Sequence, residues 1–192
     1  PIESGQIRLA GKEITRASVG SRRMAGLAYI PEDRHTDGII EDFTVADNLV
    51  LGRQRQFSQV WGLDRVSMET YARSLVERFD IRSQGLQQQA RDLSGGNQQK
   101  LVVARELGSD PLFVVASDPT RGLDFESTAF VHRALKAVRD QGSSALIFSS
   151  DLEELLSLSD RVAVIYRGRI VGIQSREAFD APALGRLMTG AA

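Results

Sequence analysis

The sequence contains no cysteine, only two histidines and a single tryptophan among its 192 residues. Without cysteine, neither disulfide bonds nor thiolate metal sites can form, a composition that suits the cytosol. The longest apolar runs are about five residues, as at 112–116, whereas a helix that crosses a bilayer needs about 20. The sequence therefore predicts no transmembrane helix.

An excess of charge of either sign is also absent. The 24 Lys and Arg residues are balanced by 25 Asp and Glu residues, which gives a net charge of −1. A surface that binds nucleic acid or anionic lipid needs an excess of positive charge, so no nucleic-acid partner is expected. The hydrophobic content of 42% is ordinary for a globular protein, and the length suits one α/β core with an appended subdomain.

A phosphate-binding loop of the form Gly-x-x-x-x-Gly-Lys-Ser/Thr is missing as well. The only Gly-Lys pair, Gly11-Lys12, is followed by Glu13. Residues 1–5 include no initiator Met and no signal-peptide pattern. We therefore expect a fragment or domain of a longer protein, without a phosphate loop of its own in this stretch.

One segment does have the composition of a phosphate-binding element, namely Leu-Ser-Gly-Gly-Asn-Gln-Gln-Lys at 93–100. Ser94 and two glycines lead into a helical pattern that starts at Asn97. Glycines let the backbone approach a ligand closely, and the free N–H groups at a helix start attract anions. Taken alone, the octamer is equally compatible with a serine helix cap behind a flexible Gly-Gly lead-in.

Strand and helix patterns alternate along the second half of the chain, which favours a parallel α/β sheet. The apolar run 112–116 and the segment 145–149, which is apolar up to Phe148, are typical of buried strands. A helical subdomain is expected between 44 and 91, with Thr44 capping one helix and Ser67 the next. The other predicted elements are a strand at 27–30, hairpins at 7–14 and 162–173, and helices at 97–107, 125–141, 151–158 and from about Pro182.

Five motifs stand in the order that they have in ABC-type ATPases. They are the stretch 1–11, Pro-Glu-Asp-Arg at 31–34, the octamer at 93–100, Pro-Thr-Arg-Gly-Leu-Asp at 119–124 and Leu-Ser-Asp-Arg-Val at 158–162. The chain thus resembles the C-terminal nucleotide-binding domain of a tandem ATPase subunit from a sugar or nucleoside ABC importer, closer in detail to the nucleoside branch. The resemblance implies a P-loop NTPase-like α/β fold: a parallel-sheet core with a helical subdomain, but without the N-terminal β and P-loop part.

The resemblance also implies that the chain consists of three structural parts. Residues 1–43 would form the N-terminal part of the core with a Q-loop-like segment, 44–96 a helical subdomain that ends in the signature octamer, and 97–192 a RecA-like α/β core. In this family the signature acts on an ATP held by the facing domain. The residues implied to bind that nucleotide are Ser94, Gly95, Gly96, Asn97 and Gln98, and those implied to form the D-loop at the interface are Gly122, Leu123 and Asp124.

The positions that would form the chain's own ATP site depart from the family pattern. Ser117 stands where an Asp supports Mg²⁺, and a neutral hydroxyl does not supply the charge that anchors the ion. Asp118 stands where a Glu activates water, but it is one methylene shorter and is at most a weak catalytic residue. Glu32 replaces the Q-loop Gln, and Ser150 replaces the switch His. We therefore expect no working hydrolytic site and no metal site within this chain.

The implied cofactors and partners follow from the family. ATP and Mg²⁺ would belong to the full assembly, with neither held tightly by this fragment. The partners would be the N-terminal ATPase half of the same protein, membrane permease subunits and, indirectly, a periplasmic or lipoprotein solute-binding protein, at the cytoplasmic face of the membrane. Two alternatives stay open: a non-transport ABC-type ATPase that acts on DNA or ribosomes, and a structural pseudo-ATPase module. Only about sixty residues separate Glu32 from Ser94, with no heptad run for the coiled coil of DNA-repair members.

Overall fold

A computed structural model describes residues 2–190 of the chain. The contacts between residues divide it into two compact units, with the boundary after Leu146. Within residues 2–190, no helix has the length and apolar character needed to cross a membrane.

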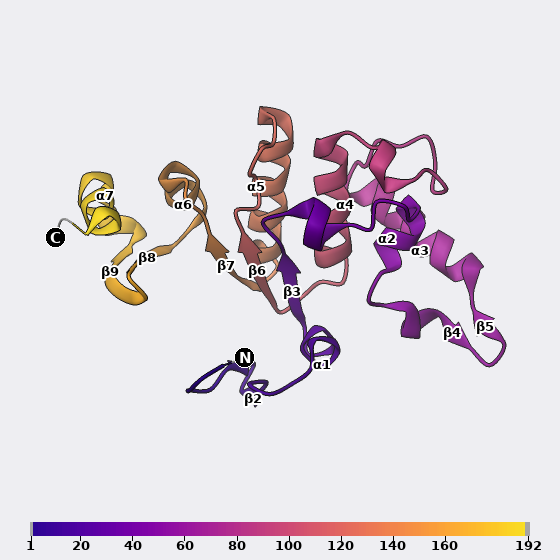
Figure 1. Cartoon of the computed structure of the whole chain (residues 1–192), viewed down its shortest axis with the longest axis horizontal. Helices are drawn as coiled ribbons and strands as arrows, with labels where there is room; N and C mark the ends of the chain where they lie inside the picture. The colour runs from indigo at the N-terminus through magenta and orange to yellow at the C-terminus, as the bar shows by residue number, and fades with distance from the viewer. Residues whose placement is uncertain (1, 191–192) are drawn as a thin grey trace. The chain divides into compact units, whose positions relative to one another are not determined.

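The first unit is built on a three-stranded sheet in the order β3-β6-β7 (Figure 1). The strands are β3 (Leu27–Ile30), β6 (Phe113–Ser117) and β7 (Ser144–Phe148). Strands β3 and β6 run parallel, with Leu27 opposite Phe113 and Ile30 opposite Ala116. A parallel pair needs a long crossover, which the intervening residues supply. The α/β class with a parallel sheet is therefore confirmed.

The predicted burial of the third strand is wrong. The side chains of Leu146 and Phe148 are each 45% exposed, although the apolar run at 145–149 favours a strand covered on both faces. Strand β7 lies at the edge of the three-stranded sheet. Burial of an apolar run depends on what covers it, and a local pattern carries no information about that cover.

The α-helices of the first unit are α1 (Val19–Met24), α2 (Val45–Val50), α3 (Arg65–Arg78), α4 (Gly95–Leu107) and α5 (Phe125–Asp140). Helix α4 is the central one, and it contacts α2, α3, α5 and β3 (Figure 1). Every residue from Gln98 to Leu107 is buried. The residues that open this helix are therefore held by neighbours on several sides.

Helix caps show where local sequence rules succeed and fail. Thr44 caps α2 as predicted, because its hydroxyl accepts the N–H of Asp47 at 3.1 Å. Ser67 does not cap α3, which was a wrong prediction. The helix begins at Arg65, and Asp64 caps it by accepting the Ser67 N–H at 3.0 Å. Aspartate and serine are about equally good caps, so the earlier of the two candidates starts the helix.

Smaller elements complete the first unit. The predicted hairpin near the N-terminus is present as β1 (Arg8–Leu9) and β2 (Lys12–Glu13). A second short hairpin, β4 (Ser58–Gln59) with β5 (Gly62–Leu63), was not predicted. The segment after β3 contains a π-helical turn, Arg34–Gly38. Asp33 caps this turn, and its hydrogen bonds from Thr36 and His35 hold the pKa of its carboxyl below the usual value.

The second unit begins in the last residues of β7 and contains α6 (Leu152–Leu158), the antiparallel pair β8 (Arg161–Tyr166) and β9 (Arg169–Ser175), and α7 (Ala181–Thr189). Both turn residues between the strands, Arg167 and Gly168, have positive φ values of 48° and 76°, as a tight hairpin turn requires. The core of this unit is formed by Val162, Val164 and Leu184. The predicted hairpin and its flanking helices are thus confirmed.

Candidate functional site

The signature octamer forms the start of α4. The helix begins at Gly95, two residues earlier than predicted, and Ser94 is its cap. The Ser94 hydroxyl oxygen accepts the backbone N–H of Asn97 at 3.4 Å and the Asn97 side-chain amide at 2.9 Å. The N–H groups of Gly95 and Gly96 have no acceptor within the helix because they lie in its first turn. Ser94 is exposed, so this helix start combines a cap with donors that suit an anion.

Gly96 has a packing role that the sequence did not reveal. A Cβ added here would lie 2.2 Å from the hydroxyl oxygen of Ser127, at the start of α5. At Gly95 the corresponding distance, to a terminal guanidinium nitrogen of Arg34, is 3.1 Å. The second glycine of the octamer is therefore required by the contact between two helix starts, independently of any ligand.

The two glutamines that follow point into the domain. The side-chain amide of Gln98 donates to the carbonyl of Ala90 at 3.1 Å, and that of Gln99 donates to the carbonyl of Pro119 at 2.7 Å. Both side chains are buried, with residue exposures of 5% and 4%. Gln99 thus joins the signature helix to the segment after β6. The role of Gln98 toward a nucleotide stays a prediction.

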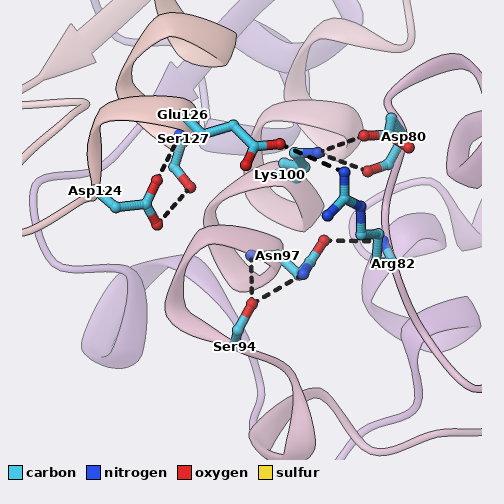
Figure 2. A network of polar contacts seen from close by, with 8 residues as sticks. All are labelled: Asp80, Arg82, Ser94, Asn97, Lys100, Asp124, Glu126 and Ser127. Carbon is cyan, nitrogen blue, oxygen red and sulfur yellow. Dashed lines mark hydrogen bonds and ion pairs between the residues drawn. The ribbon is translucent and has the colours of Figure 1, made fainter.

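Lys100 fixes the segment that follows α3. Its ammonium group lies 2.8 Å from both the backbone carbonyl and the carboxylate of Asp80, and 5.0 Å from the centre of the Phe130 ring. The hydrogen bond and the charge of Lys100 lower the pKa of the Asp80 carboxyl. Figure 2 shows this pair beside Asn97, which receives a hydrogen bond of 2.8 Å from the backbone N–H of Arg82.

The segment 122–124, which is predicted to be the D-loop, ends in a second helix cap beside the signature octamer. Asp124 caps α5 by accepting the N–H of Ser127 at 2.8 Å and its hydroxyl at 3.1 Å (Figure 2). These two bonds hold the pKa of the Asp124 carboxyl below its ordinary value. Before it, Gly122 has a φ of 69°, and the Leu123 N–H bonds the carbonyl of Thr120 at 3.1 Å. The loop is therefore a defined turn that leads into α5.

The end of β6 carries the two residues that are predicted to replace the magnesium-supporting and water-activating carboxylates. Ser117 is the last strand residue, and Asp118 follows with a φ of 37°, a left-handed conformation that aspartate tolerates better than most residues. Among residues 2–190, no three His, Cys, Asp or Glu side chains gather as metal ligands. The degeneracy of this position therefore stays a prediction, which rests on the neutral Ser117 in place of a carboxylate.

Glu32 lies in an ion pair that the sequence analysis missed. Its carboxylate contacts the guanidinium of Arg121, in the segment between β6 and the D-loop. Both side chains are more than 40% exposed, so the pair contributes little to stability. It nevertheless directs Glu32 toward the D-loop segment. Ser150, at the predicted switch position, belongs to the second unit and precedes the Asp151 cap of α6.

Several residues of this site had no sequence signal. Arg82 acts through its backbone N–H, which every residue except proline carries. Asp80 and Ser127 are ordinary polar residues whose partners lie 20 and 31 positions away in the chain. Lys100 and Arg121 were already marked, as members of the motifs 93–100 and 119–124.

Comparison with known proteins gives a consistent result. Residues 1–121 match the family described as ABC transporter. The chain is 40% identical over 191 residues to a nucleoside import ATP-binding protein, NupA, of Lactococcus lactis, an alignment that covers 98% of this chain and 38% of that protein. It is 39% identical to a guanosine import ATP-binding protein, NupO, of Bacillus subtilis, with 98% and 37% covered. For a ribose import ATP-binding protein, RbsA, of Streptococcus agalactiae, the identity is 34%, with 98% and 38% covered.

The fold is shared with solved ATP-binding cassettes. The post-hydrolysis dimer of MJ0796, bound to ADP and Pi, has a TM-score of 0.74 at 15% identity, with 92% of this chain and 75% of that chain covered. The ADP conformation of MJ1267 has a TM-score of 0.72 at 17% identity, with 97% and 74% covered. The chain spans less than two-fifths of the length of the three curated relatives. From the motif order, the fold and these matches, the chain belongs to the ABC transporter family.

Proposed function

We propose that this chain is the C-terminal ATPase domain of a tandem ATP-binding subunit in a sugar or nucleoside importer, which completes the ATP site of its N-terminal partner while its own site is degenerate. Two regions of the structure support the proposal. The start of α4 presents hydroxyl and N–H donors at an exposed position, whereas β6 ends in Ser117 without a metal-binding cluster among residues 2–190. The single observation that carries it is the exposed Ser94 cap at the signature helix.

The relatives support the tandem arrangement and the branch. This chain aligns with only 37–38% of relatives whose names describe import ATP-binding proteins, which leaves room in them for a second ATPase half. Identity is 40% and 39% to the nucleoside and guanosine proteins, against 34% to the ribose protein. We therefore place the chain in the nucleoside branch.

The mechanism assigned to this chain is electrostatic. ATP held with Mg²⁺ by the other half supplies the γ-phosphate on which charge develops during hydrolysis. The Ser94 hydroxyl and the N–H groups of Gly95 and Gly96 donate to the oxygens of that phosphate, in an orientation fixed before the reaction. Asp118 does not act as the general base of a second site, because its side chain is one methylene shorter than that of Glu and its neighbour Ser117 is neutral. In the assembly, closure of the two halves is transmitted through the Glu32 segment and the helical subdomain to the membrane permease subunits, which receive solute from a solute-binding protein.

A complementation experiment tests the proposal. Residues 1–192 alone should show no Mg²⁺-dependent ATP hydrolysis above background, since they provide no phosphate loop. The separately produced N-terminal half should be nearly inactive, and mixing the two should restore turnover, measured as phosphate release. Hydrolysis by residues 1–192 alone would contradict the assignment. Failure of an intact full-length protein to hydrolyse ATP would favour the pseudo-ATPase alternative.

A further inference from the structure

Three groups at the start of α4 form a directed chain of hydrogen bonds. The backbone N–H of Arg82 donates to the side-chain oxygen of Asn97 at 2.8 Å. The side-chain NH₂ of Asn97 donates to the hydroxyl oxygen of Ser94 at 2.9 Å. In Figure 2 the Asn97 carboxamide lies between the two partners, with its oxygen toward Arg82 and its nitrogen toward Ser94.

The direction of this chain follows from donor chemistry. A backbone N–H only donates, so the group of Asn97 that faces Arg82 must be its oxygen, and the side-chain amide has one permitted orientation. The NH₂ group therefore faces Ser94, and it too only donates. The Ser94 oxygen accepts this bond and also the backbone N–H of Asn97 at 3.4 Å. A hydroxyl has two acceptor sites and one hydrogen, so its hydrogen is left to point away from Asn97.

The first donor of the chain is itself held in place. Lys100 binds both the carbonyl and the carboxylate of Asp80 at 2.8 Å, two residues before Arg82. Asp80 has a left-handed backbone with a φ of 47°, which directs the chain out of α3 toward Asn97. The guanidinium of Arg82 reaches Glu126 on α5 at 3.4 Å. Both side chains of that ion pair are at least 70% exposed, so it adds little. The backbone N–H of Arg82 is thus fixed relative to the signature helix by the contacts of Lys100 with Asp80.

We propose that Asn97 is a positioning residue that turns the Ser94 hydroxyl outward as a hydrogen-bond donor for the γ-phosphate of the partner's ATP. The inference rests on the proposed trans role of Ser94. Phosphate oxygens only accept hydrogen bonds, so a serine whose lone pairs face outward opposes the phosphate, and one whose hydrogen faces outward stabilises it. Because Asn97 occupies both acceptor sites of Ser94, the favourable orientation exists before ATP arrives, and catalysis gains from such prior orientation.

The test is a double-mutant cycle in the full-length ATPase, with kcat for Mg-ATP as the readout. We expect Asn97→Ala to lower kcat about tenfold, less than the 10²–10³-fold typical for complete loss of a transition-state donor, since the hydroxyl itself remains. In a Ser94→Ala background the same substitution should change kcat by less than about twofold, because no hydroxyl is left to orient. A tenfold loss in both backgrounds would show that Asn97 acts by another route and would overturn the inference.

Two variants sharpen the test. Asn97→Asp is nearly isosteric and still accepts the Arg82 N–H, but its second oxygen accepts the Ser94 hydrogen and removes it from the phosphate. Its kcat should fall at least as far as that of Asn97→Ala, and near-normal turnover would contradict the chain's direction. Glu126→Ala is the control, since it removes the exposed ion pair with the Arg82 guanidinium but leaves Arg82, Asn97 and Ser94 unchanged, and its kcat should stay within about twofold of wild type.

Failure of this inference is distinguishable from failure of the proposed function. If Ser94→Arg leaves turnover unchanged, the signature of this chain does not act on ATP and the proposed function falls. If Ser94→Arg abolishes turnover while Asn97→Ala is additive with Ser94→Ala, the proposed function stands and only the orienting role of Asn97 is wrong.

Discussion

Gln99 connects the start of α4 to the segment after β6, yet the two regions differ in the groups that they offer to a ligand. At the start of α4, the exposed Ser94 hydroxyl and two glycine N–H groups are donors held by neighbouring elements. At the end of β6, Ser117 is neutral, and the carbonyl of Pro119 is already bound by Gln99 at 2.7 Å. A phosphate can be bound by N–H and hydroxyl groups that helix geometry supplies, whereas Mg²⁺ needs carboxylates at particular positions. If the proposed function holds, a single substitution at the end of β6 weakens the metal site while the donors at the start of α4 are kept.

The largest effect that separates the two regions is expected from Ser94→Arg in the full-length ATPase. The substitution removes the hydroxyl and places a long side chain where a facing domain would close. Turnover should fall by at least about 10²-fold, as for loss of a transition-state donor, while binding of ATP by the other half persists. Phosphate release and binding of a fluorescent ATP analogue measure the two quantities. Turnover at the wild-type rate would remove the functional distinction between the two regions.

A smaller but substantial effect on stability is expected at Gly96. In Gly96→Ala the new Cβ would meet the Ser127 hydroxyl oxygen at 2.2 Å, and overpacking of this kind costs about 1–3 kcal/mol. Ser127→Ala should recover part of the loss, because the remaining Cβ of residue 127 lies at 3.3 Å. Thermal unfolding measures the change.

Gly185 in α7 offers a matched control for that substitution. It also lies inside a helix, but a Cβ there meets nothing within 4 Å. Gly185→Ala should therefore be neutral or stabilise by about 0.5–1 kcal/mol. Equal destabilisation at both glycines would mean that the close contact with Ser127 is not the cause.

The pH dependence of stability is expected to change when Lys100 is removed. Lys100 lowers the pKa of Asp80 below its ordinary value of 3.8. A carboxyl whose folded pKa is lowered stabilises the fold above its unfolded pKa, and this contribution is lost as the pH falls through the folded pKa. Lys100→Met should therefore lower stability at neutral pH and reduce the further loss on acidification below about pH 4. The account would be refuted if the free energy of unfolding fell equally in the two proteins between pH 7 and pH 3.

The smallest effect is expected at the end of β6. Ser117→Ala in the full-length ATPase should change turnover by less than about twofold, or about 0.4 kcal/mol, because we do not expect the Ser117 hydroxyl to bind a metal ion. The same variant should keep normal thermal stability within about 0.5 kcal/mol. A loss of turnover comparable to that of Ser94→Arg would show that this site is catalytically engaged.

Local features of the fold were predictable where short-range chemistry decides them. The Thr44 cap, the hairpin predicted at 162–173 and the presence of a parallel sheet follow from hydrogen-bonding residues, turn residues and apolar runs. Cap choice failed at Ser67, where Asp64 stands three residues earlier and competes for the same helix start. The predicted burial of β7 was also wrong, because a local sequence pattern does not say which other elements pack over a strand.

The sequence by itself determined the family, through five motifs in a defined order, and the chemical contrast between Ser94 with its glycines and Ser117. Only the tertiary structure decided which groups hold the signature in place. The backbone N–H of Arg82 bonds Asn97 across 15 positions of the chain, and Ser127 limits residue 96 to glycine from 31 positions away. Such contacts depend on how helices pack, and a backbone N–H or an ordinary serine gives no sign in the sequence of the partner that packing will bring to it.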